Sequence, residues 1–221
     1  MQTRSLFITF EGPDACGKST VSKLVCKKLQ EYFNDEKKVV WTREPGGTEV
    51  GEKIRELLNN YNLDPRTEAL LFAASRSELT WKNIMQNRSQ NKIILCDRYL
   101  HSSLVYQGIV KNIGYKNVLK INEFAIGKFR PDIIFYFDLS EKESYKRKMN
   151  DANRNHDDRL ESEFGQEEKI KKAINAYYSV FKFDNKKVIR INAHLSIEEI
   201  TNKIFDIIIS RAVKNEKRQN I

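Results

Sequence analysis

A glycine-rich loop near the start of the chain constrains the fold more than any other segment. The loop reads Gly12-Pro13-Asp14-Ala15-Cys16-Gly17-Lys18-Ser19, after the apolar run Leu6–Phe10 and before an amphipathic segment, Thr20–Phe33. A strand, a glycine loop and a helix in this order direct backbone N–H groups and a positive helix end toward an anion. The pattern G-x-x-x-x-G-K-[ST] predicts a nucleotide polyphosphate, with Lys18 on its outer phosphates and the Ser19 hydroxyl on Mg²⁺. A chance glycine turn is the alternative, and the flanking strand and helix argue against it.

Length and composition fit one globular domain over residues 1–221. Hydrophobic residues make up 40% and charged residues 31% of the chain, which is ordinary for a globular protein. No apolar run is long enough to span a membrane and no signal-peptide segment precedes the first strand, so we expect a cytoplasmic protein with no membrane partner. Three unevenly spaced cysteines, Cys16, Cys26 and Cys96, indicate reduced thiols rather than a zinc site or a disulfide framework.

A net charge of +9 is compatible with a protein that binds nucleic acid, because contacts from Lys and Arg to phosphate dominate nucleic-acid binding. The basic residues are nevertheless spread along predicted helices, and only the tail Lys214–Arg218 concentrates them. A solvated helix end explains that tail, and polyanionic ligands explain the charge balance as a whole. We therefore expect no nucleic-acid partner.

Short apolar runs alternate with longer helical patterns along the chain. The runs are rich in β-branched or aromatic residues and lie at Leu6–Phe10, Val39–Trp41, Ile93–Cys96, Ile133–Phe137 and Val188–Ile191. A helical pattern between such runs is typified by Ile200, Ile204, Ile207 and Ile208, which share one face. This alternation predicts an α/β fold in which helices flank a five-stranded, mostly parallel sheet. Ligands bind such sheets at the carboxyl ends of the strands.

Two segments after the second strand carry candidate binding residues. In the loop Thr42–Thr48, glycines let the backbone approach a ligand and Arg43 can fork onto a phosphate; a plain turn with a surface arginine fits equally well. In the helix after Pro65, Phe72 and Arg76 lie one turn apart on one face. This pair fits a planar base, with Phe72 stacking and Arg76 donating to an exocyclic carbonyl, although these residues alone favour a core role for the ring.

The third strand ends in an acidic residue followed by a basic one, Asp97-Arg98. ATPases that activate a water molecule typically place Glu after the strand-end Asp, whereas an Arg there would hold a second anion. We therefore predict that Asp97 acts through Mg²⁺ and its waters and that Arg98 holds an acceptor phosphate. His101 is predicted to be a surface or packing residue, because no residues at metal-ligand spacing accompany it.

A polar segment from about residue 150 to residue 165 interrupts two helical patterns. It is similar to a mobile lid, in which Arg154 and Arg159 would fold over the phosphates and stabilise transferring charge. A solvated helix connection explains the same residues equally well.

Taken together, these segments resemble the thymidylate kinase family over nearly the whole chain. Residues 42–48 reproduce T-R-E-P-G-G-T and residues 97–107 match D-R-Y-x-x-S-S-x-x-Y-Q; further matches are Phe72–Arg76, Phe129–Asp132 and Asp158–Glu161. The resemblance implies a three-layer P-loop nucleoside monophosphate kinase fold and ATP-dependent phosphorylation of dTMP to dTDP. It also implies a homodimer. Apolar residues such as Leu70, Leu71 and Ala74 are interface candidates, although a buried core would have the same sequence.

The resemblance assigns residues to the base of dTMP. It implies that Phe72 and Arg76 contact thymine, with Ser103 and Gln107 beside the base edge. It assigns the whole glycine loop, Gly12 to Ser19, to ATP.

The resemblance also assigns residues to the rest of dTMP. It places Arg43 and Arg98 on the phosphate. Asp14 is assigned to the neighbourhood of the sugar 3′-hydroxyl or the phosphates, and Tyr106 to the 2′ side of the sugar.

The glycine loop departs from part of the family. Some members, including the eukaryotic type, carry a basic residue inside this loop, whereas this chain has Ala15 and Cys16. The missing charge is expected from Arg154 and Arg159, as in the bacterial type, and only Arg159 lies in a matched motif. The acceptor phosphate is already an anion near neutral pH, so no general base is needed. The protein's task is then to position the γ-phosphoryl group and neutralise its charge through Lys18, Mg²⁺, Arg98 and the lid arginines.

Other nucleotide-binding classes fit the sequence less well. A GTPase switch needs Asn-Lys-x-Asp, and the nearest segment, Asn185–Val188, ends in valine. A nucleic-acid-dependent ATPase needs a water-activating acid where this chain has Arg98. The closest alternative is a kinase for another nucleoside monophosphate.

Overall fold

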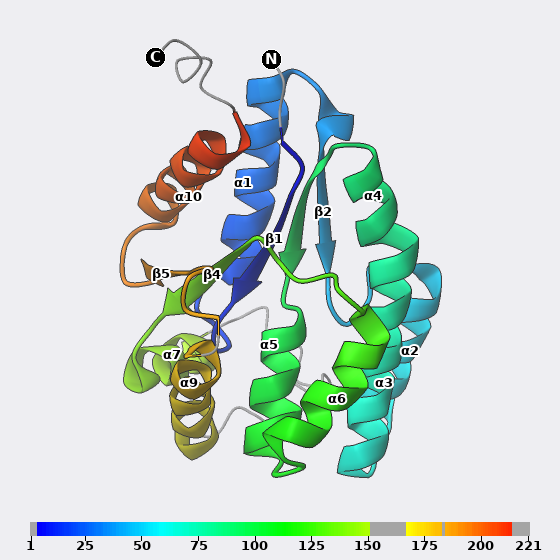
Figure 1. Ribbon diagram of the computed structural model, residues 1–221. Coiled ribbons are helices and arrows are strands. Elements are labelled where there is room, and N and C mark those ends of the chain that lie inside the picture. Colours follow the sequence, from blue (N-terminus) through cyan, green and yellow to red (C-terminus); the bar gives the residue numbers. More distant parts are fainter. Residues whose placement is uncertain (1–3, 151–166, 183, 214–221) are drawn as a thin grey trace.

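The computed structural model describes residues 4–150, 167–182 and 184–213. At its centre lies a five-stranded sheet with the strand order β2-β3-β1-β4-β5 (Figure 1). The strands are β1 (Leu6–Glu11), β2 (Val39–Arg43), β3 (Ile93–Asp97), β4 (Ile133–Asp138) and β5 (Val188–Asn192). All neighbouring strands are parallel, so the predicted α/β fold is confirmed and the sheet is parallel throughout.

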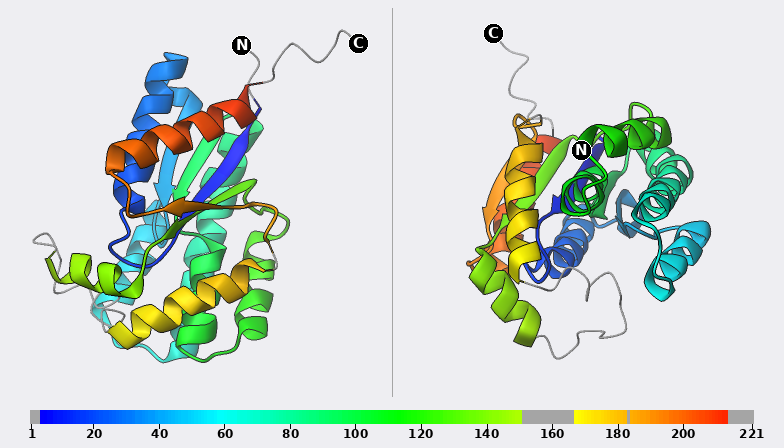
Figure 2. Two further views of the ribbon diagram at one scale, coloured as in Figure 1. Left: turned by 90° about the vertical axis from the view of Figure 1, so that its left-hand side faces the viewer. Right: turned by 90° about the horizontal axis from the view of Figure 1, so that it is seen from below.

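Helices cover both faces of the sheet and make the molecule three layers thick (Figure 2). One face carries α1 (Lys18–Phe33) and α10 (Ile197–Ala212). The other carries α3 (Pro65–Leu79), α5 (Leu100–Ser103), η3 (Leu104–Val110), α6 (Tyr115–Ile126) and α9 (Glu167–Phe181). The remaining elements are η1 (Glu36–Lys38), α2 (Glu49–Asn60), η2 (Thr80–Ile84), α4 (Met85–Ser89) and α7 (Glu141–Asn150).

Local sequence signals fix several of the helix starts. The Asp64 side chain accepts a hydrogen bond from the Arg66 N–H, and Pro65 occupies the first turn of α3, where its missing N–H costs nothing. Ser196 and Glu199 form a reciprocal capping box at the start of α10. The apolar stripe predicted for α10 is buried at Ile200, Ile204 and Ile208 and only half-buried at Ile207.

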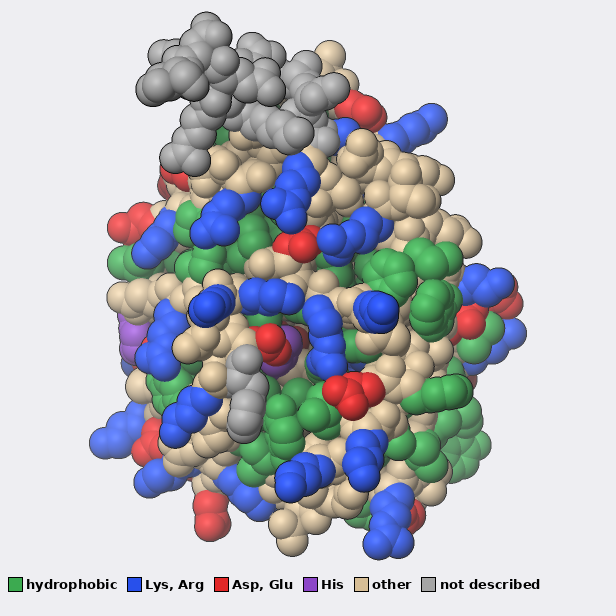
Figure 3. All heavy atoms as spheres, viewed as in Figure 1, with side chains coloured by type: hydrophobic (Ala, Val, Ile, Leu, Met, Phe, Trp, Pro, Cys, Tyr) green, Lys and Arg blue, Asp and Glu red, His purple; other side chains and the backbone are tan. Residues whose placement is uncertain are grey.

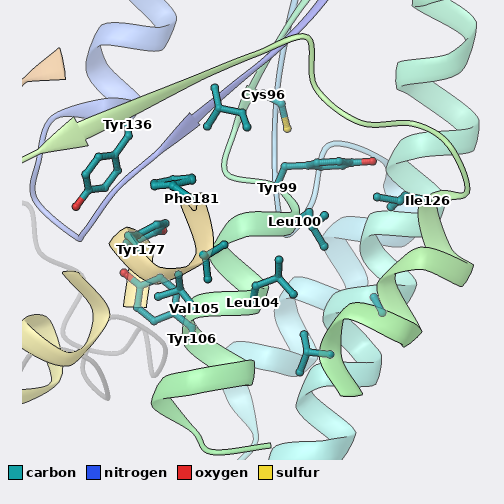
Figure 4. Close-up of a cluster of buried hydrophobic side chains, with 14 of the residues drawn as sticks. Cys96, Tyr99, Leu100, Leu104, Val105, Tyr106, Ile126, Tyr136, Tyr177 and Phe181 are labelled. Atoms are coloured by element: carbon teal, nitrogen blue, oxygen red, sulfur yellow. The ribbon is translucent and has the colours of Figure 1, made fainter. Parts of the chain in front are cut away.

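Strand side chains divide the core into two clusters, because successive residues point to opposite faces of a sheet. Leu6, Ile8 and Phe10 pack with the α1 and α10 layer, whereas Phe7 packs on the other face. That second cluster lies between the sheet and its second layer of helices and is rich in aromatic rings, several of which are drawn in Figure 4. Within it the rings of Tyr177 and Phe181 stack with their centroids 5.5 Å apart.

The three cysteines are buried free thiols. None of the helices that the structure describes is long and apolar enough to cross a membrane. On the face seen in Figure 3, Lys and Arg side chains are scattered among acidic and apolar ones rather than gathered into one patch. The tail from residue 214 lies outside the described residues.

Candidate functional site

A cleft of about 730 Å³ opens at the carboxyl edge of the sheet. The register of the strands brings distant segments together there, since Asp97 on β3 pairs with Phe10 on β1 and with Arg43 on β2. Most of the side chains that the sequence singled out line this cleft: Asp14, Lys18, Ser19, Arg43, Phe72, Arg76, Asp97, Arg98, Ser103, Tyr106 and Gln107. Arg154, Arg159 and the rest of the predicted lid from residue 151 lie outside the described residues.

The glycine loop has the geometry of an anion cradle. Gly12 has a φ of 152°, and a Cβ there would lie 2.9 Å from the carbonyl oxygen of Phe137. Gly17 has a left-handed backbone with a φ of 87° and precedes α1, whose first turn has no side-chain cap and no acidic residue. The first N–H groups of α1 therefore face the cleft uncapped, as an anion site requires. Lys18 is 6% exposed, and its Nζ donates to the carbonyl oxygen of Pro13 at 3.3 Å.

The Ser19 hydroxyl donates a hydrogen bond to Oδ2 of Asp97. The other carboxylate oxygen, Oδ1, is buried and has no hydrogen-bond partner among the described residues. A buried acceptor of this kind calls for a partner, because leaving it unsatisfied is costly. The hydroxyl and the carboxylate together provide the oxygen ligands that Mg²⁺ prefers. The described residues contain no cluster of three or more His, Cys, Asp or Glu that would hold a metal without a substrate.

Arg98 is held at the centre of the cleft. Its backbone is left-handed with a φ of 66°, a conformation that residues other than glycine adopt at a cost and that is common at functional sites. Its Nη1 donates to the Gly12 carbonyl at 3.1 Å, to Ser102 Oγ at 3.1 Å and to the Tyr177 hydroxyl at 3.3 Å. Its guanidinium lies 5.3 Å from the centre of the Tyr106 ring. These contacts place a fixed positive charge beside the glycine loop.

Asp14 ties this arginine to the loop. Its Oδ1 lies 2.5 Å from Nη2 of Arg98, and its Oδ2 lies 3.0 Å from Nζ of Lys148. Burial raises the pKa of Asp14, but the charges of Arg98, Lys148 and Lys18 outweigh that effect and lower it to about 2. The carboxylate is therefore ionised at neutral pH.

Arg76 lies in the wall of the cleft and is 1% exposed. Its Nε and Nη2 donate to the two carboxylate oxygens of Glu44, and its Nη1 donates to Asn122. Burial raises the pKa of Glu44, and the guanidinium acts against that rise. Nη1 carries two N–H bonds and has this single acceptor among the described residues, so one N–H remains for a ligand.

Ser103 and Gln107 continue the same polar wall. Ser103 Oγ accepts from Arg76 Nη2 at 3.2 Å and donates to Gln107 Oε1 at 3.0 Å. Gln107 Nε2 donates to the fully buried carboxylate of Glu68, which also pairs with Lys111 at 2.5 Å. The two side chains predicted to lie beside the base edge are thus linked to each other and to Arg76.

Phe72 and Tyr106 supply the aromatic surfaces of the cleft. Phe72 is half-buried, lines the cleft and belongs to neither hydrophobic cluster of the described residues. Tyr106 is 8% exposed and meets Tyr177 edge to face at 6.2 Å. The core role that the sequence alone favoured for Phe72 is therefore not its position here, whereas Tyr106 both joins the aromatic cluster and faces the cleft.

Arg43 faces an acidic partner in this structure. Its Nη2 lies 2.9 Å from Oε2 of Glu52, and the two side chains are 42% and 44% exposed. Oε1 of the same carboxylate accepts from the Gly47 N–H at 2.9 Å. An exposed pair of this type is weak, so Arg43 can exchange it for a phosphate.

His101 is a packing residue rather than a surface one. It is 1% exposed, and its Nε2 lies 3.0 Å from Oδ2 of Asp184. This hydrogen bond lowers the pKa of the Asp184 carboxyl against the effect of burial. The contact joins α5 to the segment that precedes β5.

Sequence reasoning missed the buried acids that hold the site together: Glu11, Glu44 and Glu68. Glu11 accepts from the Tyr99 N–H at 3.0 Å and from Ser102 Oγ at 2.6 Å. A signal was present for Glu11, because an acid at the end of an apolar strand needs buried partners. Glu44 lies within the matched segment Thr42–Thr48, but the sequence predicted no role for it. Lys148 gave no signal, because it lies in a helix crowded with other charges.

Comparison with known proteins finds similarity over most of the length of the chain. Residues 10–204 match the family model described as thymidylate kinase. A thymidylate kinase of Malacoplasma penetrans is 59% identical over 208 residues, which cover 94% of this chain and 97% of that protein. One of Staphylococcus haemolyticus is 37% identical, with coverage of 93% and 98%. The crystal structure of thymidylate kinase from Ehrlichia chaffeensis matches with a TM-score of 0.71 at 30% identity, covering 92% of this chain and 98% of that one.

Proposed function

The chain belongs to the thymidylate kinase family and phosphorylates dTMP to dTDP with ATP as the donor, and we propose that the transfer is direct and in line. The observation that carries this proposal is the shared cleft, which Phe72, Arg76 and Arg98 line together with residues of the glycine loop, and in which Arg98 also contacts Gly12 and Asp14 of that loop. Two anionic ligands can therefore meet at one arginine. Holding both reactants in line removes much of the entropic part of the barrier.

The donor side is formed by the glycine loop. Its backbone N–H groups and Lys18 would bind the outer phosphates of ATP. Ser19 and Asp97 would hold Mg²⁺, and the orphaned Oδ1 of Asp97 supports this fit. When bound, Mg²⁺ neutralises negative charge on the phosphates.

The acceptor side needs charge and position rather than a base. A phosphate oxygen of dTMP is already anionic near neutral pH, so no residue has to remove a proton from it. Arg98 and Arg43 would hold this phosphate, with Asp14 near the sugar 3′-hydroxyl or the phosphates. Arg154 and Arg159, outside the described residues, would add charge at the transferring group.

The base and the sugar would be recognised by the walls of the cleft. Phe72 would stack on thymine while the remaining N–H of Arg76 donates to its 4-carbonyl, with Ser103 and Gln107 beside the base edge. The ring of Tyr106 would pack against the 2′ carbon. A ring that is buried and touched by Arg98 makes a rigid wall there.

We also propose that the enzyme is a homodimer that works in the cytoplasm. Leu70 on α3 is 56% exposed and Leu57 on α2 is 44% exposed, and Ala74 on α3 is exposed as well. Exposed apolar side chains on two helices that pack together support an interface. Analytical ultracentrifugation of Leu70→Lys against the parent tests this, because a charge at a self-complementary interface is met twice. The three free thiols suit a reducing compartment.

A coupled ADP-release assay over a panel of nucleoside monophosphates tests the activity. dTMP should give the highest kcat/KM, and ADP release should need an acceptor. Higher kcat/KM for another monophosphate would favour a different kinase of this class. ADP release that requires added DNA instead would favour the nucleic-acid-dependent ATPase.

A further inference from the structure

A buried lysine on α7 is bound to the phosphate loop at a single residue. Lys148 has a side chain that is 5% exposed, and its Nζ lies 3.0 Å from Oδ2 of Asp14. One turn earlier on the same helix face, Ser144 Oγ donates to the backbone carbonyl of Asp14 at 2.8 Å. Helix α7 therefore contacts both the backbone and the carboxylate of Asp14.

The same carboxylate is the partner of Arg98. Its Oδ1 lies 2.5 Å from Nη2 of Arg98, so one negative charge is shared between two cations. Arg98 and Asp14 line the cleft, whereas Lys148 is not among the residues that line it. Through Asp14, Lys148 can therefore act on Arg98 in the cleft.

A carboxylate inside a loop that binds polyanions has two unfavourable effects. It repels the incoming phosphates, and it competes with them for the guanidinium of Arg98. A second cation on its far oxygen reduces both effects, because the opposite charge is then no longer supplied by Arg98 alone. Within the loop itself Lys18 is the only residue that adds a positive charge near this carboxylate, since Ala15 and Cys16 stand at the loop's centre.

We propose that Lys148 is a positioning residue for phosphoryl transfer, which holds the Asp14 carboxylate and so leaves the charge of Arg98 available to the acceptor phosphate. This proposal rests on the proposed role of Arg98 at the dTMP phosphate. Because Asp14 carries the effect, the contribution of Lys148 should vanish when Asp14 is neutral.

Steady-state kinetics of Lys148→Met tests the first part. We expect kcat/KM for dTMP to fall roughly ten- to a hundredfold, the range for losing one hydrogen bond between charged groups. The KM for dTMP should rise more than the KM for ATP, because Arg98 serves the acceptor. Lys148→Arg should restore most of the activity, and Lys142→Met, at an exposed position of the same helix, should match the parent.

A double-mutant cycle with Asp14→Asn tests the second part. The variant Asp14→Asn/Lys148→Met should lose no more kcat/KM than Asp14→Asn alone. Removing both partners also avoids leaving one buried charge unpaired, so the double variant keeps the test available if Lys148→Met folds poorly; Lys148→Gln, which can donate without a charge, is the second single variant.

Three results would overturn the proposal. They are losses that multiply in the double variant, a Lys148→Met or Lys148→Gln enzyme as active as Lys142→Met, and a KM for ATP that rises more than that for dTMP. A parent enzyme that does not phosphorylate dTMP would instead refute the proposed function, so the two failures are distinguishable.

Discussion

The guanidinium of Arg76 forms a two-point ion pair with the carboxylate of Glu44, and both side chains are 1% exposed. The pair joins α3 to the loop after β2 and fixes the orientation of the arginine within the cleft wall. Few of its donors are left for a ligand, so the direction of the remaining N–H depends on Glu44. If Arg76 binds the base as proposed, the recognition of the base therefore depends on Glu44 as well as on Arg76.

Glu44→Gln should destabilise the fold much more than Glu52→Gln. Neutralising one partner of a buried pair leaves an uncompensated charge and costs about 3–5 kcal/mol. The Arg43–Glu52 pair is over 40% exposed on both sides, and such pairs contribute about 0–1 kcal/mol. Urea unfolding of the two variants and the parent measures the difference. Equal losses for the two variants would contradict the ranking.

Lys18→Ala should abolish phosphoryl transfer while leaving the fold intact. Lys18 is the loop residue proposed to bind the outer phosphates of ATP, and its ammonium donates to the Pro13 carbonyl. Circular dichroism and the kinase assay should be run together, with Lys27→Ala on the exposed side of α1 as the control. A folded Lys18→Ala enzyme that keeps its activity would refute the assignment of the loop.

The sequence predicted the sheet well because each strand is a short apolar run, and such a run predicts a buried strand even when the strands that pair with it are unknown. The glycine loop could also be predicted from the sequence, since Gly12 and Gly17 adopt backbone conformations that favour glycine. The hydrogen-bond network around Arg76 could not be predicted from the sequence. Its partners Glu44 and Asn122 lie 32 and 46 residues away in the chain, and only the fold shows that they meet.

The same limit applies to charges that act in groups. The position of Arg98 directly after the strand-end Asp97 predicted an anion ligand, but the hydrogen bonds of Arg98 to Asp14 and Tyr177 span 84 and 79 residues. Lys148 is one of several charged residues in α7, and burial alone distinguishes it from its neighbours. Tertiary packing, rather than local pattern, decides which of these cations pairs with Asp14.

The parent enzyme should accept dCMP far less well than dTMP. The N–H of Arg76 suits the 4-carbonyl of thymine, whereas cytosine presents an amino donor at that position. A buried donor left unpaired can reject the wrong group by several orders of magnitude, about 10⁴-fold in favourable cases. Arg76→Ala should lose this discrimination together with affinity. Equal kcat/KM for the two nucleotides in the parent would show that this contact is misassigned.

Acid should remove the stabilising contribution of Asp14. Its pKa is lowered from 3.8 to about 2 in the fold. A carboxyl group whose pKa is lower in the folded than in the unfolded chain stabilises the fold when the pH is above its unfolded pKa. The contribution of Asp14 is therefore fully present above pH 3.8 and is lost as the pH falls toward 2. The shift corresponds to about 2 kcal/mol.

Urea unfolding of the parent and Asp14→Asn at pH 5 and pH 3 measures this loss. The free-energy difference between them should shrink at the lower pH. Asp206→Asn, at an exposed position of α10, serves as the control. A difference that stays constant between the two pH values would contradict the expectation.

Tyr106 should set the preference for a deoxyribose sugar. The centre of its ring lies 5.3 Å from the guanidinium carbon of Arg98 and 6.2 Å from the centre of the Tyr177 ring, and these neighbours restrict its movement. A ribose 2′-hydroxyl would clash with the ring or be buried without a partner, at a cost of about 1–3 kcal/mol. The expected preference for dTMP over ribothymidine monophosphate is about tenfold to a hundredfold.

Two variants separate the ring of Tyr106 from its hydroxyl. Tyr106→Phe keeps the wall and should keep the preference, whereas Tyr106→Ala should narrow it even where overall activity falls. Because both nucleotides share every other contact, the ratio of their kcat/KM values is insensitive to a general loss of activity. An alanine variant that discriminates between the two sugars as well as the parent does would show that another group excludes the ribose.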